Sequence, residues 1–181
     1  MEFGTRKAIV GVGSALVDIL LKESDAFVEE AGAEKGGMIL VDAGKITSVL
    51  TNSLEKPAVV PGGSACNTIV GIGRLGGKAK FIGKRGEDDL GELFERGLRA
   101  SNVEPSLLTS PSPTGRVLSI VTPDAQRSMF TFLGASSEAT PDEVLPEDFA
   151  NAAVVHIEGY LLFNRELILA ALKAAKKAGA R

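Results

Sequence analysis

The sequence predicts an α/β fold with a mostly parallel sheet, helices on both of its faces and a small second sheet. Three observations predict it: short apolar runs alternate with segments of helical periodicity, 44% of the 181 residues are hydrophobic, and a β-rich hairpin interrupts the alternation. Parallel strands are expected because a crossover helix returns the chain to the same end of the sheet.

Strands are expected where short apolar runs are bounded by glycine or other turn residues, at 7–12, 16–21, 37–41, 78–82 and 153–157. Helices are expected where apolar residues recur every three to four positions, at 25–31, 43–52, 66–75, 88–100 and 165–178. Two further β-rich segments, 116–122 and 127–133, flank Pro123-Asp124 and predict the hairpin.

The composition argues against several classes of function. The net charge of −3 argues against a nucleic-acid surface, and no apolar run reaches the ~18 residues of a membrane-spanning helix. Cys66 is the only cysteine, which is typical of a reducing cytoplasm, and with His156 as the only histidine no zinc site of these residues is expected. Residues 1–6 (MEFGTR) show no periodicity and are expected to be a cloning remnant, which leaves 7–181 as the folded part.

A dinucleotide-binding loop is the first candidate site, at Gly11-Val12-Gly13-Ser14. Its third glycine position is occupied by Leu16, and a strand rather than a helix is expected to follow. A phosphate would therefore find no helix N-terminus, which favours a glycine turn over a nicotinamide site.

The second candidate is Pro61-Gly62-Gly63-Ser64, which leads into a helix. Its glycines allow a ligand to approach the backbone, free amides at the helix start bind hydroxyl or anionic groups, and Asn67 offers both a donor and an acceptor. The alternative is a simple glycine turn with Ser64 as N-cap. The third candidate is Asp18, which either faces solvent or accepts hydrogen bonds from two ligand hydroxyls.

Several motifs together resemble a known family. Gly62-Gly63-x-x-x-Asn67 and Gly83-x-x-Gly86-x-Asp88-x-x-Gly91 are similar to the N-terminal signature of the ribokinase-like (PfkB-type) carbohydrate kinases. Gly13-x-x-x-x-Asp18 fits the opening of that family, and Thr114-Gly115 with Pro123-Asp124-x-x-Arg127 fits its lid hairpin. Residues 25–42 resemble the adenosine-kinase branch. The resemblance implies a ribokinase-like three-layer α/β/α fold with lid strands at about 16–21, 37–41 and 114–133.

The resemblance also implies ATP-dependent phosphorylation of a sugar or ribonucleoside hydroxyl. It implies acceptor contacts from Ser14, Asp18, Gly62, Gly63, Asn67 and Tyr160. Arg127, in the lid, would then approach the transferred phosphate, although a solvated hairpin residue is the alternative. For Tyr160 the alternative is a core aromatic. The expected partner is a small molecule, and a dimer through the lid sheet is a further expectation.

ATP and Mg²⁺ are the cofactors that the resemblance implies. The family's later region carries a Gly-Ala-Gly-Asp anion hole, whose aspartate is the catalytic base, and an element tied to magnesium, and we do not find this region in residues 1–181. The chain is therefore expected to be a truncated N-terminal part that supplies the acceptor-binding half and the lid and is inactive alone. The alternative is a non-catalytic ligand-binding or complementing fragment.

Overall fold

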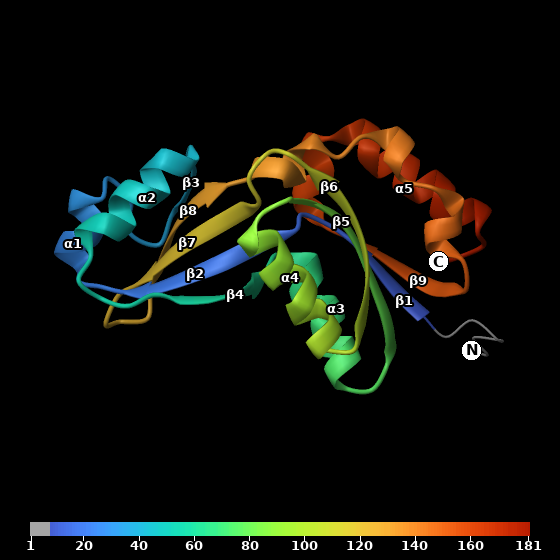
Figure 1. Ribbon diagram of the computed structural model, residues 1–181, viewed down its shortest axis with the longest axis horizontal. Helices are drawn as coiled ribbons and strands as arrows, with labels where there is room; N and C mark the ends of the chain where they lie inside the picture. The colour runs from blue at the N-terminus through green and yellow to red at the C-terminus, as the bar shows by residue number, and fades with distance from the viewer. Residues whose placement is uncertain (1–7) are drawn as a thin grey trace.

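The computed structural model describes residues 8–181, so the predicted remnant at 1–6 lies outside the described residues. The chain forms two sheets (Figure 1). The four-stranded sheet is parallel throughout, and its order is β6 (Val103–Ser110), β5 (Lys78–Gly86), β1 (Ala8–Val12) and β9 (Ala152–Ile157). The five-stranded sheet is mixed, and its order is β3 (Met38–Leu40), β8 (Arg127–Phe132), β7 (Gly115–Val121), β2 (Leu16–Lys22) and β4 (Ala58–Gly62).

The four-stranded sheet is the middle of three layers. On one face, Ile9 and Phe81 pack with α3 (Ser64–Arg74) and α4 (Asp89–Ala100). On the opposite face, Val10 and Val12 pack with α5 (Arg165–Lys177), which is preceded by the short 3₁₀ helices η1 to η4 (Gly134–Glu138, Pro141–Glu143, Pro146–Phe149, Gly159–Phe163). This arrangement follows from the strand period of two, because successive residues of a fully covered strand face opposite layers.

The five-stranded sheet is covered on one face only. The helices α1 (Asp25–Glu30) and α2 (Ala43–Asn52) bury that face through Ile19, Leu118 and Phe130 (Figure 1). Asp18 is adjacent to Ile19 in β2, so its side chain emerges on the other face. That face also carries Leu20, Met38, Leu40 and Val60, all of which are exposed.

The chain crosses between the two sheets four times. The crossings are 13–15, 62–63, 111–114 and 133–134. A Cβ on Gly115 or Gly134 would overlap the backbone of the neighbouring crossing, and Ala135 N–H donates to Pro113 O at 2.9 Å. The two sheets are therefore joined by a narrow neck of closely packed backbone.

The expected α/β fold with a mostly parallel main sheet is confirmed, and so are the predicted helices, with ends shifted by one or two residues. The second sheet is not small, since it has five strands. The strands β4 and β6 were not predicted, because Pro61 and Pro105 interrupt their sequences; both strands lie at a sheet edge, where proline is tolerated. No helix within residues 8–181 has the length and hydrophobicity to span a bilayer.

Phe94→Ala should lower the free energy of unfolding by about 3–5 kcal/mol, measured by urea denaturation. Phe94 is fully buried, its ring meets that of Phe81 edge-on at a centroid distance of 5.6 Å, and it shares a core with Val17 of β2. Leu54→Ala is the control, because Leu54 is fully exposed and its removal should stay within about 0.5 kcal/mol. Similar losses in the two variants would contradict this packing.

Candidate functional site

The predicted site residues from the first half of the chain meet where β2 and β4 reach α3. Ser14 lies in the crossing between β1 and β2, and Asp18 lies two residues inside β2. The antiparallel register of β2 and β4 pairs Leu16 with Gly62 and so brings Gly62 and Gly63 to the same place. Asn67 follows in the first turn of α3, where its N–H donates to Gly63 O at 2.9 Å.

Asp18 is a half-buried carboxylate without a hydrogen-bond or ion-pair partner among residues 8–181. A Cβ on Gly62 would overlap this carboxylate, so the glycine makes room for it. Burial raises the pKa of Asp18, and the charge of Arg127 partly opposes this rise. The structure thus keeps an acceptor of hydrogen bonds open at the rim of the crossing.

Gly63 is the N-cap of α3 and has a φ of 91°, a conformation that favours glycine. No side chain caps this helix and Ser64 is its first residue, so the alternative with Ser64 as N-cap is wrong. The first amides of α3 are therefore free to donate to a ligand. Asn67 is exposed one turn along, and its side chain has no partner within the described part of the chain.

Glu158 follows β9 and is a buried acid beside the same crossing, 3% exposed. Its carboxylate accepts a hydrogen bond from Ser14 N–H at 2.7 Å. Burial raises its pKa, while the Ser14 amide, the Ser64 side chain and the charge of His156 lower it in part. Glu158 is not among the site residues predicted from the sequence.

Cys66 lies fully buried in the first turn of α3. Burial raises the pKa of its thiol to about 12, and the negative charges of Asp18 and Glu158 add to this effect. Both carboxylates therefore lie close enough to act on one small side chain. The thiol stays protonated at neutral pH and behaves as a small apolar group, as its position in the core indicates.

Arg127 and Tyr160 approach the site from two other elements. Arg127 is exposed at the start of β8, and its charge reaches Asp18 across the open face of the five-stranded sheet. Tyr160 is 61% exposed, so the core alternative for this residue is wrong. It lines a hollow of about 310 Å³ together with Ser64, Gly159, Leu162 and Phe163.

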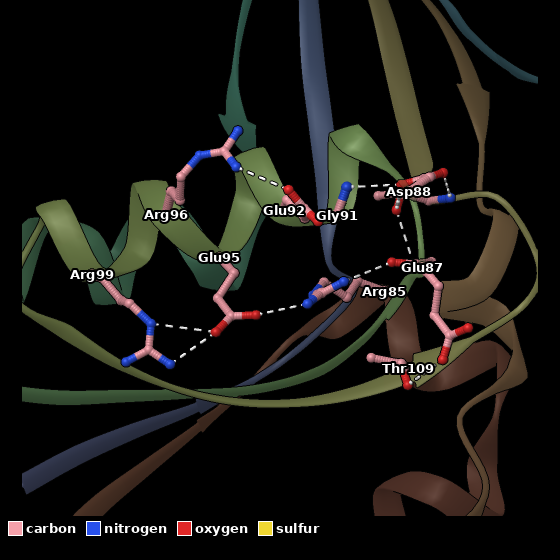
Figure 2. A network of polar contacts seen from close by, with 11 residues as sticks. Arg85, Glu87, Asp88, Gly91, Glu92, Glu95, Arg96, Arg99 and Thr109 are labelled. Carbon is pink, nitrogen blue, oxygen red and sulfur yellow. Dashed lines mark hydrogen bonds and ion pairs between the residues drawn. The ribbon is translucent and has the colours of Figure 1, made fainter.

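Asp88 anchors the five-stranded sheet to α4. Its carboxylate accepts hydrogen bonds from Gly91 N–H at the start of α4 and from the N–H and hydroxyl of Thr114, just before β7. Burial alone would raise the pKa of Asp88, but these hydrogen bonds outweigh it and the pKa is lowered. Figure 2 shows the contact with Gly91 beside an ion-pair chain in which Glu95 binds Arg85 and Arg99.

Within residues 8–181, no group of three or more His, Cys, Asp or Glu residues is arranged to hold a metal ion. The described residues thus do not form a magnesium site of their own, and no chemical step is assigned to magnesium.

Comparison with known proteins places the chain among phosphotransferases. The family profile described as "pfkB family carbohydrate kinase" matches residues 39–181. A probable fructokinase-3 of Arabidopsis thaliana is 31% identical over 153 residues, which are 80% of this chain and 44% of that protein. The chain spans less than half the length of the curated relatives it matches.

Two solved structures show the same fold. The adenosine kinase from Sinorhizobium meliloti superposes with a TM-score of 0.87 at 35% identity, covering 97% of this chain and 55% of that one. A probable sugar kinase protein from Rhizobium etli gives a TM-score of 0.88 at 34% identity, covering 98% and 55%. The predicted ribokinase-like fold and the resemblance to this family are confirmed.

Cys66 should be unreactive in the folded chain. Its thiol is buried and has a pKa of about 12, so the folded chain should release no thionitrobenzoate from dithiobis(nitrobenzoate) within minutes at pH 8. After unfolding in guanidinium, the chain should release one equivalent. Rapid reaction of the native chain would contradict the packing of the first turn of α3.

Proposed function

The chain belongs to the pfkB family of carbohydrate kinases, and on this premise we propose that it binds the acceptor of an ATP-dependent phosphoryl transfer, a sugar or a ribonucleoside. The observation that carries the proposal is Asp18, a half-buried carboxylate that has no hydrogen-bond or ion-pair partner among residues 8–181 and lies against Gly62, just before an uncapped helix.

The chemistry of this pair suits a polyol. A carboxylate accepts hydrogen bonds from two adjacent hydroxyls, and such charge-assisted bonds are about twice as strong as neutral ones. The free amides that follow Gly63 donate to the oxygens of the same groups, and Asn67 can do both. Gly62 leaves room for the Asp18 carboxylate, and Gly63 leaves room for Ser14 O, so the two glycines allow the groups of the proposed site to lie close together.

The open face of the five-stranded sheet bears on the size of the acceptor. Val60 pairs with Asp18 across β2 and β4 and is exposed, as are Leu20, Met38 and Leu40 on the same face. A free sugar would cover little of this apolar surface. A nucleoside would place its hydroxyls at Asp18 and its apolar base over these side chains, which favours a ribonucleoside.

The five-stranded sheet would act as a lid. Closure over the acceptor would exclude water and so limit wasteful hydrolysis of ATP, and it would carry Arg127 toward the transferred phosphate as a fixed planar cation. ATP would supply the phosphoryl group. A dimer through this sheet stays a prediction from the resemblance.

The second candidate function is ligand binding without catalysis. It is favoured by one observation: the family's Gly-Ala-Gly-Asp sequence, which would supply the base, does not occur in residues 1–181. Phosphoryl transfer depends on positioning and charge stabilisation, so binding of the acceptor alone gives no turnover. Binding and turnover are therefore tested separately.

Asp18→Asn should weaken acceptor binding about 10- to 100-fold, because each hydrogen bond to a charged group contributes about 1.5–3 kcal/mol. Calorimetry with adenosine, ribose and fructose measures this effect. Asp142→Asn is the matched control, because Asp142 is an exposed carboxylate in η2, and this variant should bind the acceptor as tightly as the unaltered chain does. Unchanged affinity in Asp18→Asn would refute the role of Asp18.

The same substitution should not lower the thermal midpoint at pH 7. A carboxyl whose pKa is raised by burial destabilises the folded chain when ionised, so stability rises as the pH falls through the raised pKa towards the ordinary value of 3.8. Asn removes the charge and with it this pH dependence. A large loss of stability in Asp18→Asn would indicate a structural role instead.

The chain of residues 1–181 should bind an acceptor without consuming ATP. A coupled assay of ADP release, with each of the three acceptors, should give the buffer rate, while calorimetry detects binding. If the chain consumes ATP and this activity disappears in Asp18→Asn, the prediction of inactivity is wrong, while the proposed binding role of Asp18 stands.

A further inference from the structure

Glu158 is a buried acid to which the proposed function gives no task. It is held from both sides: its own N–H donates to Val12 O at 2.9 Å, and its carboxylate accepts from Ser14 N–H at 2.7 Å. The Ser64 side chain interacts with the same carboxylate. One side chain at the end of β9 thus contacts the crossing into β2 and the first residue of α3.

These two contacts belong to the two halves of the acceptor site. Ser14 precedes β2, which carries Asp18, whereas Ser64 begins the helix that carries the free amides and Asn67. The halves also touch directly, since a Cβ on Gly63 would lie 2.8 Å from Ser14 O. The position of Ser14 therefore sets the distance between Asp18 and the helix start.

Gly13 shows how closely Glu158 fits. A Cβ on Gly13 would overlap a carboxylate oxygen of Glu158 and would lie 2.8 Å from Ala65 Cβ. The glycine at this position is explained by the carboxylate and the helix packed against it, and not by its backbone conformation, because Gly13 is not among the glycines with positive φ.

Keeping an acid here is costly. Glu158 is 3% exposed and forms no ion pair with Lys or Arg among the described residues, and an apolar side chain of similar size would avoid the cost of burying a carboxylate. A carboxylate differs from an apolar side chain in having two oxygens that can hold two donors in fixed positions. The hydrogen bond from Ser14 N–H comes from one half of the site, and Ser64, whose side chain also acts on this carboxylate, begins the other half.

We propose that Glu158 is a positioning residue of the acceptor site, which fixes the Ser14 crossing and the start of α3 relative to each other and so sets the spacing between Asp18 and the helix amides. This inference rests on the proposed function for its ligand. Glu158 acts through Ser14 and Ser64 and does not itself touch the acceptor.

The first test needs no ligand. Amide hydrogen exchange of the unaltered chain, Glu158→Ala and Glu158→Gln is followed in peptides spanning 13–18 and 62–68. Glu158→Ala should raise exchange at least tenfold in both peptides, because the Ser14 amide loses its acceptor. Glu158→Gln should change it less than threefold, since the amide oxygen accepts from Ser14 and the amide nitrogen can donate to the Ser64 hydroxyl. Unchanged exchange in Glu158→Ala overturns the proposal.

The second test measures affinity for adenosine, ribose and fructose by calorimetry. Glu158→Ala should bind the preferred acceptor at least tenfold more weakly, and Glu158→Gln within threefold of the unaltered chain. Leu167→Ala is the control for general destabilisation. Leu167 is buried in the core between α5 and the four-stranded sheet, a cluster that contains none of the proposed acceptor residues, so this variant should lower the thermal midpoint and leave affinity unchanged.

The outcomes separate the two proposals. Equal loss of affinity in Glu158→Gln and Glu158→Ala would indicate a charge contact with the ligand and would overturn the positioning role of Glu158. Equal loss in Leu167→Ala would indicate general destabilisation and would overturn that role as well. If Glu158→Ala does not fold, Glu158→Gln decides: more than tenfold weaker binding overturns the proposal. If Asp18→Asn loses affinity while Glu158→Ala does not, the acceptor site stands and positioning fails. No binding by the unaltered chain overturns the proposed function and with it the role of Glu158.

Discussion

Close approach of backbone at the neck between the two sheets is the constraint on which the rest of the structure depends. β1 pairs within the four-stranded sheet and β2 within the five-stranded sheet, and only residues 13–15 separate them. Such a short connection leaves no freedom in where β2 begins. Because Leu16 then pairs with Gly62, the start of α3 is brought to the same crossing.

The electrostatics of the site follow from this geometry. Asp88 and Asp18 both lie partly buried near the neck, yet Asp88 receives hydrogen bonds from Thr114 and Gly91 and its pKa is lowered, whereas Asp18 receives none and its pKa is raised. The first carboxylate is satisfied by the fold and stabilises it. The second receives no hydrogen bond from the described residues, and for this reason we propose it as a binding group rather than a structural one.

Much of the fold could be predicted from periodicity, and the limits have physical causes. The helix at 64–74 is evident because Ile69 and Ile72 recur at helical spacing, whereas β6 is obscured by Pro105 at an edge where the ladder does not need its N–H. Asp18, Gly63 and Asn67 could be proposed from local motifs. Glu158 could not, because its hydrogen bond to Ser14 joins residues 144 positions apart and no local pattern encodes that contact.

The crowded neck also has a consequence for the unfolded chain. Gly13, Gly63 and Gly134 lie at crossings and Gly115 directly follows one, and a Cβ on any of them would overlap or press on a neighbouring backbone or side chain. Glycine has more conformational freedom than any other residue before folding and loses more of it on folding. The conformational entropy lost at these crossings must be offset by the hydrophobic cores of the two sheets on either side of them. Bringing these backbone segments so close therefore lowers the stability of the chain, and this close approach explains part of its content of 21 glycines.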